Sequence, residues 1–221
     1  MQTISSIIDQ LAISESPLST PLLGTKILAS RIKNNDLLQW VNNEIEGYED
    51  ANKVPLYRIA PCNLQGSYVN GNVKVTDTAL PIPDISDKIT KYLTSTRITQ
   101  SCSALEYLLS AGDKSGQISY KLSGDVLQFL QRKYSEQNPF MGLYSATLVT
   151  SVSVFYDILA STRSKLLDLM LKLESEYGNN PTIAQLSSGN PMINNFVQNI
   201  YNTGNNNVIN TGDNSSLTSI S

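Results

Sequence analysis

Apolar residues recur at the spacing of an amphipathic helix along the first part of the chain. Residues 4–11 predict a short helix. Residues 19–32 predict a second helix, with Pro21 in the first turn, where its missing N–H costs nothing. We expect the buried stripe of this second helix to consist of Leu23, Ile27, Leu28 and Ile32.

A third amphipathic run follows a short asparagine link. Residues 35–46 predict a helix that Asn35 caps and that Gly47 ends. The link is so short that the second and third helices are expected to be antiparallel neighbours. Trp40 lies between stripe positions, and we expect it in the core with its indole N–H hydrogen-bonded nearby.

The pattern changes between residues 54 and 83, where proline, glycine and β-branched residues replace the helical stripe. Asn70-Gly71 separates two β-branched segments, and both central positions of a two-residue hairpin turn need positive φ. We therefore expect a small β insertion, built around this hairpin, after the third helix.

The second half of the chain returns to helical spacing, interrupted by short alternating segments. Helices are predicted at 85–93, 103–111 and 126–130, and strands at 118–122 and 148–155. The clearest helix is 155–177, which ends before Gly178. Its apolar stripe consists of Ile158, Leu159, Thr162, Leu166, Leu169, Met170 and Leu173.

These elements predict an α+β fold: a mostly helical domain with a small β insertion, plus a C-terminal short β-repeat tail. We place the domain at residues 1–177. Turn-forming residues follow and indicate a linker at 178–190, and an asparagine-rich tail then occupies 191–221.

The tail contains one eight-residue pattern twice, at residues 199–206 and 207–214. Each copy has an apolar pair that can begin a strand, an asparagine that can stack on its equivalent, and a glycine that can turn the chain. Two copies of such a short repeat are too few to bury a hydrophobic core, so we expect other copies of the chain to complete that core. The residues of this oligomerisation contact are Ile200, Tyr201, Asn202, Gly204, Val208, Ile209, Asn210 and Gly212. The alternative is a disordered tail of low complexity.

Composition excludes several kinds of catalysis. The 221 residues include no histidine and only two cysteines, Cys62 and Cys102. Zinc sites that need histidine and nucleophiles activated by histidine are therefore excluded. We predict no metal and no cofactor, and an enzyme with this composition would depend on carboxylates, lysines, tyrosines or backbone amides.

Charge and hydropathy restrict the partners and the location. Sixteen basic and nineteen acidic residues give a net charge of −3, and the basic residues do not cluster, so nucleic acid is an unexpected partner. No window approaches the roughly 20 apolar residues of a membrane span, and the first residues lack the pattern of a signal peptide. We expect a cytoplasmic protein that does not bind membranes.

Residues 18–177 resemble the AbiTii domain of bacterial abortive-infection proteins. The resemblance is carried by LASRIKNNDLLQWVNNEIEGY at 28–48, VPLYR at 54–58, LPIP at 80–83 and ILASTRSKLLDLMLKLE at 158–174. We call the following the signature residues: Arg31, Trp40, Asn43, Glu44, Gly47, Tyr48, Arg58, Arg97, Gln100, Ser101 and Arg163. The resemblance implies defence against phage within the bacterial cell, and it brings no catalytic residue that transfers to this sequence.

Four carboxylates lie around the predicted end of the third helix: Glu44, Glu46, Glu49 and Asp50. Such a cluster can support metal-assisted hydrolysis, or it can be the solvated end of a helix. We favour the second interpretation, because residues two apart on a helix, such as Glu44 and Glu46, point in different directions.

Two pairs of basic residues would form an anion site if their helices converged: Arg31 with Lys33, and Arg97 with Arg163. Alternatively, these are surface charges, or one buried arginine pairs with Glu44. We favour the ion pair, because an arginine and a glutamate of the signature on packed helices suit a structural bridge.

Three functions are compatible with the sequence. The one that we favour is anti-phage defence by binding and homo-oligomeric assembly, with the chain itself and a phage or defence-system protein as partners. The second is a metal-dependent hydrolase or nuclease that uses the carboxylates near Glu44. The third is a nucleic-acid-binding module.

Overall fold

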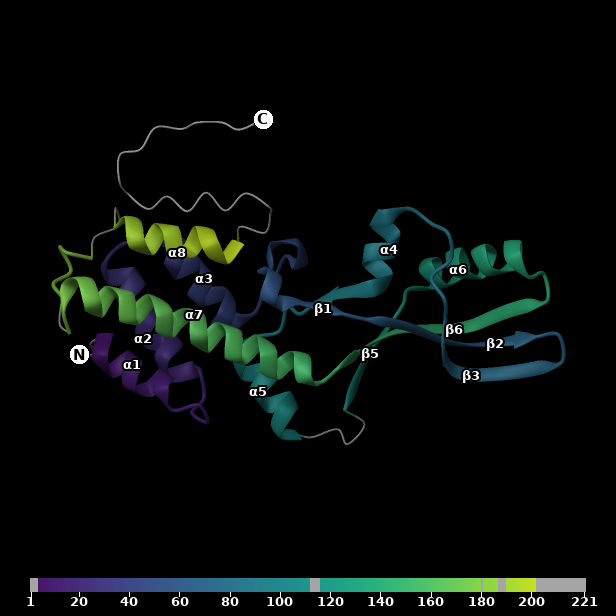
Figure 1. The fold of residues 1–221 in the computed structure, drawn as a ribbon, viewed down its shortest axis with the longest axis horizontal. Coiled ribbons are helices and arrows are strands. Elements are labelled where there is room, and N and C mark those ends of the chain that lie inside the picture. Colours follow the sequence, from purple (N-terminus) through teal and green to yellow (C-terminus); the bar gives the residue numbers. More distant parts are fainter. Residues whose placement is uncertain (1–3, 112–115, 180, 187–189, 202–221) are drawn as a thin grey trace, which may run out of the picture.

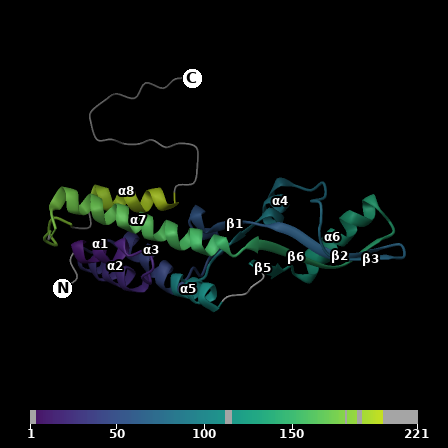
Figure 2. The same cartoon turned by 60° about the horizontal axis from the view of Figure 1, so that its bottom comes forward.

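The computed structural model describes residues 4–111, 116–179, 181–186 and 190–201. The molecule is elongated, with a helical body at one end and an arm built on a sheet at the other (Figures 1 and 2). The helical body consists of α1 (Ile4–Ala12), α2 (Ser19–Arg31), α3 (Asn35–Glu46), α5 (Cys102–Ala111), α7 (Ser153–Tyr177) and α8 (Pro191–Tyr201).

The β arm consists of β2 (Asn63–Asn70), β3 (Val73–Ala79), α4 (Asp87–Thr94), β5 (Gln117–Lys121), α6 (Gly124–Gln137) and β6 (Met141–Ser151). The junction between body and arm consists of η1 (Ala51–Lys53), η2 (Leu56–Arg58), β1 (Ile59–Pro61) and β4 (Ser95–Arg97). The α+β expectation is thus confirmed. No helix within the described ranges combines the length and the apolar character that a membrane span requires.

The core of the helical body forms where α7 meets α1, α2, α3 and α8. The stripe predicted for 155–177 is confirmed, because all of its members are buried except Leu159, which is partly buried. Trp40 is also in this core, fully buried, and its indole N–H donates to the Tyr57 hydroxyl at 3.0 Å.

The prediction for the buried face of α2 is right for two of its four residues, because Ile32 is buried and Leu28 is partly buried against the core. Leu23 and Ile27 are 50% and 48% exposed, whereas Leu22, Thr25 and Ala29 are buried. Because α2 contacts both α1 and α3, the face that turns inward is the one whose small side chains allow neighbouring helices to approach closely. Periodicity alone selected the more hydrophobic stripe, which lies to one side of that face.

α3 begins and ends where the sequence predicted, with a different cap. The side chain of Asn34, rather than that of Asn35, accepts a hydrogen bond from the Leu37 N–H at 2.9 Å. Gly47 ends the helix with φ of +96°. A Cβ at this position would lie 2.9 Å from the Thr99 carbonyl oxygen, so the close approach of the two backbones requires glycine.

The sheet of the β arm has the strand order β3-β2-β6-β5, and neighbouring strands are antiparallel. The predicted hairpin is confirmed, but its turn is shifted by one residue. Asn70 pairs with Val73, so Gly71 and Asn72 are the central positions, and of these only Gly71 has positive φ, +57°. α4 and α6 pack against one face of the sheet, in a core that includes Leu64 of β2 and Leu130 of α6.

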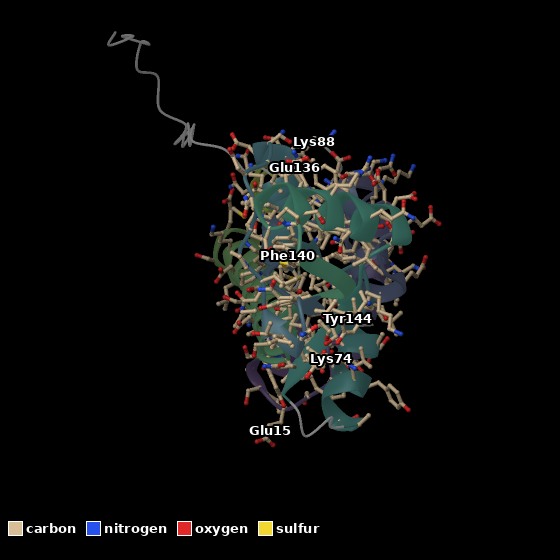
Figure 3. All side chains as sticks on the ribbon, turned by 90° about the vertical axis from the view of Figure 1, so that its right-hand side faces the viewer. Glu15, Lys74, Lys88, Glu136, Phe140 and Tyr144 are labelled. Atoms are coloured by element: carbon tan, nitrogen blue, oxygen red, sulfur yellow. The ribbon has the colours of Figure 1, made fainter. Side chains whose placement is uncertain are left out.

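β6 begins seven residues before the predicted strand at 148–155 and ends at Ser151. The pairing of β2 with β6 shifts between Ser67 and Tyr68, and this bulge interrupts the alternation by which the first half of the strand would have been identified. The last predicted strand residues instead begin α7. Phe140, directly before β6, lies at the end of the arm when the arm is viewed end-on (Figure 3).

The residues expected to open the tail form helix α8 instead of a strand. Ile200 and Tyr201, the first predicted strand pair, are the last two residues of this helix. Ile193 and Ile200 are seven apart, so a helix places both on one face, and both are buried against the body. The ring of Phe196 packs edge-on against Trp40 with 5.4 Å between centroids. The eight-residue repeat includes the last residues of this helix, and reading them as part of the repeat hid their helical spacing.

The remaining residues of the predicted oligomerisation contact lie outside the described residues. They are Asn202, Gly204, Val208, Ile209, Asn210 and Gly212. Assembly through them stays a prediction.

Leu166→Ala is expected to lower the free energy of unfolding by about 2–5 kcal/mol, because it removes a large, fully buried side chain from the middle of α7. Chemical denaturation measures this change. Leu171→Ala on the same helix is the control: Leu171 is 44% exposed, and its loss should cost no more than about 0.5 kcal/mol. Equal effects would show that the two faces of α7 are assigned wrongly.

Candidate functional site

The centre of the signature is a buried ion pair between Glu44 of α3 and Arg58 of η2. Both side chains have no exposed surface. Arg58 Nη2 donates to Glu44 Oε2 at 2.5 Å, and Arg58 Nε donates to Glu44 Oε1 at 3.1 Å. This two-point contact matches the planar guanidinium to the planar carboxylate, which is the strong geometry for such a pair.

Neighbouring side chains complete the hydrogen bonding of the Glu44 carboxylate. The hydroxyls of Tyr48 and Tyr57 donate to Oε1 at 2.6 and 2.8 Å. The Cys102 thiol of α5 donates to Oε2 at 3.1 Å, and the Thr162 hydroxyl of α7 lies 3.3 Å from the same oxygen. The carboxylate therefore contacts groups from the segment directly after α3, from η2, from α5 and from α7.

Arg58 is held equally completely. Its Nη1 donates to the carbonyl oxygens of Ile98 and Gln100 at 3.2 and 2.7 Å. Its guanidinium carbon lies 5.0 Å from the centre of the Tyr48 ring, a cation–π contact. The segment that follows β4 is thereby fixed to α3, and the Tyr48 N–H, which donates to the Thr99 carbonyl at 2.8 Å, adds a second connection.

The charges of the pair stabilise each other. Burial alone would raise the pKa of Glu44, but the Arg58 charge and the hydrogen bonds outweigh it, and the pKa lies below its ordinary value. Burial opposes the charge of Arg58 as well, yet the Glu44 carboxylate raises its pKa. Burial and the same carboxylate raise the pKa of the Tyr48 phenol and the Cys102 thiol, so both stay protonated at neutral pH.

The ion pair that we favoured from the sequence is present, and its arginine is Arg58. The three arginines considered there lie elsewhere: Arg31 and Arg97 are exposed, and Arg163 of α7 donates to backbone carbonyls of the α1–α2 loop. Arg58 is a signature residue through the VPLYR segment, but the sequence did not identify it as the partner of Glu44, because η2 has no periodic pattern that predicts a buried position.

The other signature residues surround the pair. Gln100 supplies the carbonyl that Arg58 contacts, and the Ser101 hydroxyl accepts from the Ala104 N–H at 3.2 Å and so caps α5. Asn43 hydrogen-bonds the Tyr201 side chain at the end of α8. These residues hold the fold of the body.

In the part of the chain that the structure describes, the carboxylates near Glu44 do not gather into a group that could hold a metal ion. Both Glu44 oxygens are occupied and closed off from solvent. Glu46 is on the surface and pairs with Lys26 at 3.1 Å, and Asp50 accepts from the Asn52 N–H. Among the described residues, no three carboxylate or thiol side chains come together as metal ligands would.

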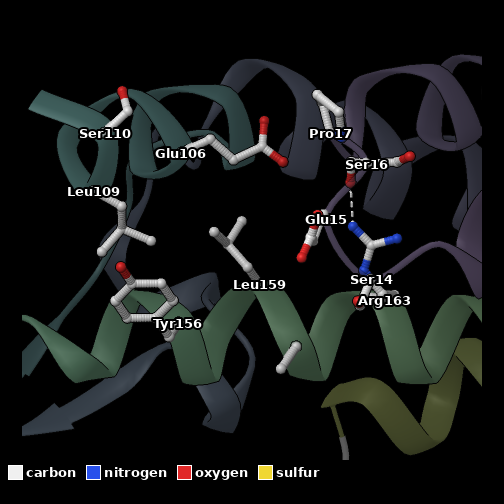
Figure 4. Close-up of a pocket in the computed structure, with 11 residues that line it drawn as sticks. Ser14, Glu15, Ser16, Pro17, Glu106, Leu109, Ser110, Tyr156, Leu159 and Arg163 are labelled. Carbon is white, nitrogen blue, oxygen red and sulfur yellow. Dashed lines mark hydrogen bonds between the residues drawn. The ribbon is translucent and has the colours of Figure 1, made fainter.

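An open groove lies between α5, α7 and the α1–α2 loop, and we call it the α5–α7 groove (Figure 4). Its volume is about 550 Å³. Leu109, Tyr156, Leu159 and Ala160 form an apolar wall, and Tyr156 is 58% exposed. The opposite end of the groove is polar and holds Glu15, Glu106 and Arg163.

The polar end of the groove holds the α1–α2 loop in place. Arg163 Nη1 donates to the carbonyls of Leu11 and Ile13 at 3.2 and 3.0 Å, and Nη2 donates to that of Ser16. Glu106 accepts from the Leu18 N–H at 2.8 Å. Two carboxylates against one guanidinium leave this end of the groove with a formal charge of −1.

The ion pair and the groove share their supporting helices. Cys102 and Thr162, which contact Glu44, are on the inner faces of α5 and α7, whereas Glu106 and Arg163 line the groove. Cys102 and Glu106 are one helical turn apart, and Thr162 directly precedes Arg163. The buried pair therefore fixes the spacing of the two groove walls.

Comparison with known proteins gives one match. The family model AbiTii matches residues 2–199, and so extends past Gly178 through most of α8. No curated protein matches the chain, and no solved structure matches it.

Glu44→Gln is expected to lower the free energy of unfolding by about 3–5 kcal/mol, because it leaves the Arg58 charge buried without a partner. Glu46→Gln, two residues away, removes only a surface ion pair and should cost about 0–1 kcal/mol. Urea unfolding compares the two. If the double change Glu44→Leu with Arg58→Met were less stable than Glu44→Gln, the unpaired charge would not be the cause.

We expect acid to weaken the fold through the same pair. Since folding lowers the pKa of Glu44, its contribution to stability is fully present above the ordinary value of 4.5 and is lost as the pH falls through the lower folded value. Glu44→Gln has no carboxylate to protonate. The difference in unfolding free energy between wild type and this variant should therefore narrow from about pH 5 to about pH 3. A constant difference would contradict the lowered pKa.

Proposed function

The chain belongs to the AbiTii family of bacterial abortive-infection proteins, and we propose that it serves in anti-phage defence by binding and self-assembly rather than by catalysis. Family membership is the observation that supports a role in defence. The mode of action rests on one observation, the closed Glu44–Arg58 pair. The acidic and basic residues that form the centre of the signature are used inside the fold and do not face a substrate.

The α5–α7 groove supports a binding role. It combines an apolar wall with a charged end, and such a surface suits a protein side chain or segment better than it suits a small charged substrate. A phage protein or another defence protein is a suitable partner.

Self-assembly is assigned to the segment that follows α8. Ile200 and Tyr201 belong to the helix, so the contact between copies begins at Asn202. Val208-Ile209 then provides the apolar pair of the second octad, and Asn-Thr-Gly follows it. We place the protein in the cytoplasm, in line with the bacterial defence role of the family.

Val208→Asp is expected to lower the mass of the assembly, because it puts an unpaired charge into an interior that only several copies close. A chain that is truncated after Tyr201 should also form an assembly of lower mass. A stop after Gly178 is unsuitable, because it removes α8 and the buried Ile193 and Ile200. Light scattering gives the mass, and circular dichroism shows that the body stays folded.

Asn206→Asp is the matched control, since it adds the same charge at a polar position of the repeat. It should keep the wild-type mass. In cells, plaque counts should show that Val208→Asp loses protection against phage and that Asn206→Asp retains it. An unchanged mass in Val208→Asp would refute assembly through this segment.

A further inference from the structure

The end of the β arm carries three exposed apolar side chains, Phe140, Val73 and Val69, and we call this end the knob. Val69 pairs with Lys74 and Val73 pairs with Asn70, so the two valines lie on opposite faces of the hairpin. Phe140 is 76% exposed and Val73 is 61% exposed, which places them among the most exposed large apolar side chains of the described residues. Figure 3 looks directly onto this end and shows Phe140 near its centre. Phe140 is an exposed aromatic side chain, a residue type that is enriched in the buried centres of protein interfaces.

Hydrogen bonds hold the knob in one shape. The Phe140 N–H donates to the Asn138 side chain at 3.1 Å, and the Phe140 carbonyl accepts from the Gly71 N–H at 3.2 Å. The Asn138 amide donates to the Asn70 side chain at 3.1 Å, which joins the α6–β6 loop to the β2–β3 turn. Binding would therefore cost little conformational entropy at the Phe140 backbone.

The charge of the arm complements that of the body. Residues 63–94 and 117–151, which make up the arm, carry six basic and five acidic side chains, so the arm has a formal charge of +1 and the rest of the chain, with ten and fourteen, has −4. Lys74 directly follows Val73, and its ammonium lies 5.5 Å from the centre of the Tyr144 ring. The polar end of the α5–α7 groove is acidic, with Glu15 and Glu106 against Arg163.

We propose that the knob of one copy inserts into the α5–α7 groove of a second copy, an interface that adds to the assembly proposed above and rests on it. Phe140 would lie against the apolar wall formed by Leu159 and Ala160, and the basic arm would face the acidic end of the groove. A groove of about 550 Å³ holds a phenylalanine side chain and part of its neighbours.

The geometry requires a second copy. The arm end and the groove lie at different places along the long axis of the molecule in both views (Figures 1 and 2), so the knob of a copy does not reach its own groove. The contact is heterologous, with different surfaces on the two sides. Each added copy therefore offers a new knob and a new groove, and copies continue until a ring closes or a filament forms.

A cysteine cross-link tests the contact in the full chain. Phe140→Cys and Ala160→Cys are prepared separately, mixed and oxidised; Ala160 is an exposed position of α7, and both native thiols are buried. We expect a disulfide between the two variants, identified by peptide mass spectrometry. Tyr92→Cys replaces Phe140→Cys in the control, because Tyr92 is an exposed aromatic residue of the arm that lies outside the knob. Cross-linking no stronger than in this control would overturn the proposal.

Phe140→Asp provides the second test, and Phe140→Leu is its conservative partner. The first should lower the mass by light scattering and the second should keep it, with equal thermal melting because the side chain is exposed. An unchanged mass in Phe140→Asp would refute the knob as an interface. The two interfaces are separable: if Val208→Asp leaves the mass unchanged while the 140–160 cross-link forms, assembly through the tail fails and the knob contact stands.

Discussion

The fold depends on the requirement that a buried charge be paired. Removing the Glu44 carboxylate and the Arg58 guanidinium from water is costly, and only a complete set of partners offsets that cost. The partners come from five segments: α3, η2, the chain after β4, α5 and α7. Each must lie at hydrogen-bond distance from the same few atoms. A hydrophobic contact would tolerate a small shift of a helix, whereas this cluster does not, so it specifies one arrangement of the body.

This constraint extends to the arm through the continuity of the chain. β6 ends at Ser151 and α7 begins at Ser153, so the longest strand and the longest helix follow each other almost without a loop. Ile98, Leu105 and Phe155 pack together where body and arm meet. The segment that contains Ile98 is also bonded to Arg58. The direction in which the arm projects is therefore set by the same cluster that sets the walls of the α5–α7 groove.

Local sequence predicted those features whose cause is local. Gly71 identifies its hairpin because the turn needs a residue that accepts positive φ, and 155–177 identifies its helix because one stripe faces one core. The inward face of α2 depends on which neighbours it meets. Likewise, the partner of Glu44 comes from a 3₁₀ turn 14 residues away, where no periodicity marks Arg58 as buried. The helical character of α8 was concealed because its last residues also begin the octad repeat.

The residues that identify the family are likewise different from the residues that can show how the protein acts. The part of the signature that surrounds the buried pair tolerates few residue types: glycine where Thr99 approaches Gly47, and donors wherever a carboxylate oxygen needs one. Such residues identify the fold while contacting nothing outside it. The surfaces that can meet a partner, the knob around Phe140 and the wall around Leu159, consist of apolar residues of common types. They indicate a binding surface only because they are exposed in the folded protein. Exposure is a property of the folded chain, so the functional surfaces of this protein become visible only after the charged cluster has fixed the scaffold.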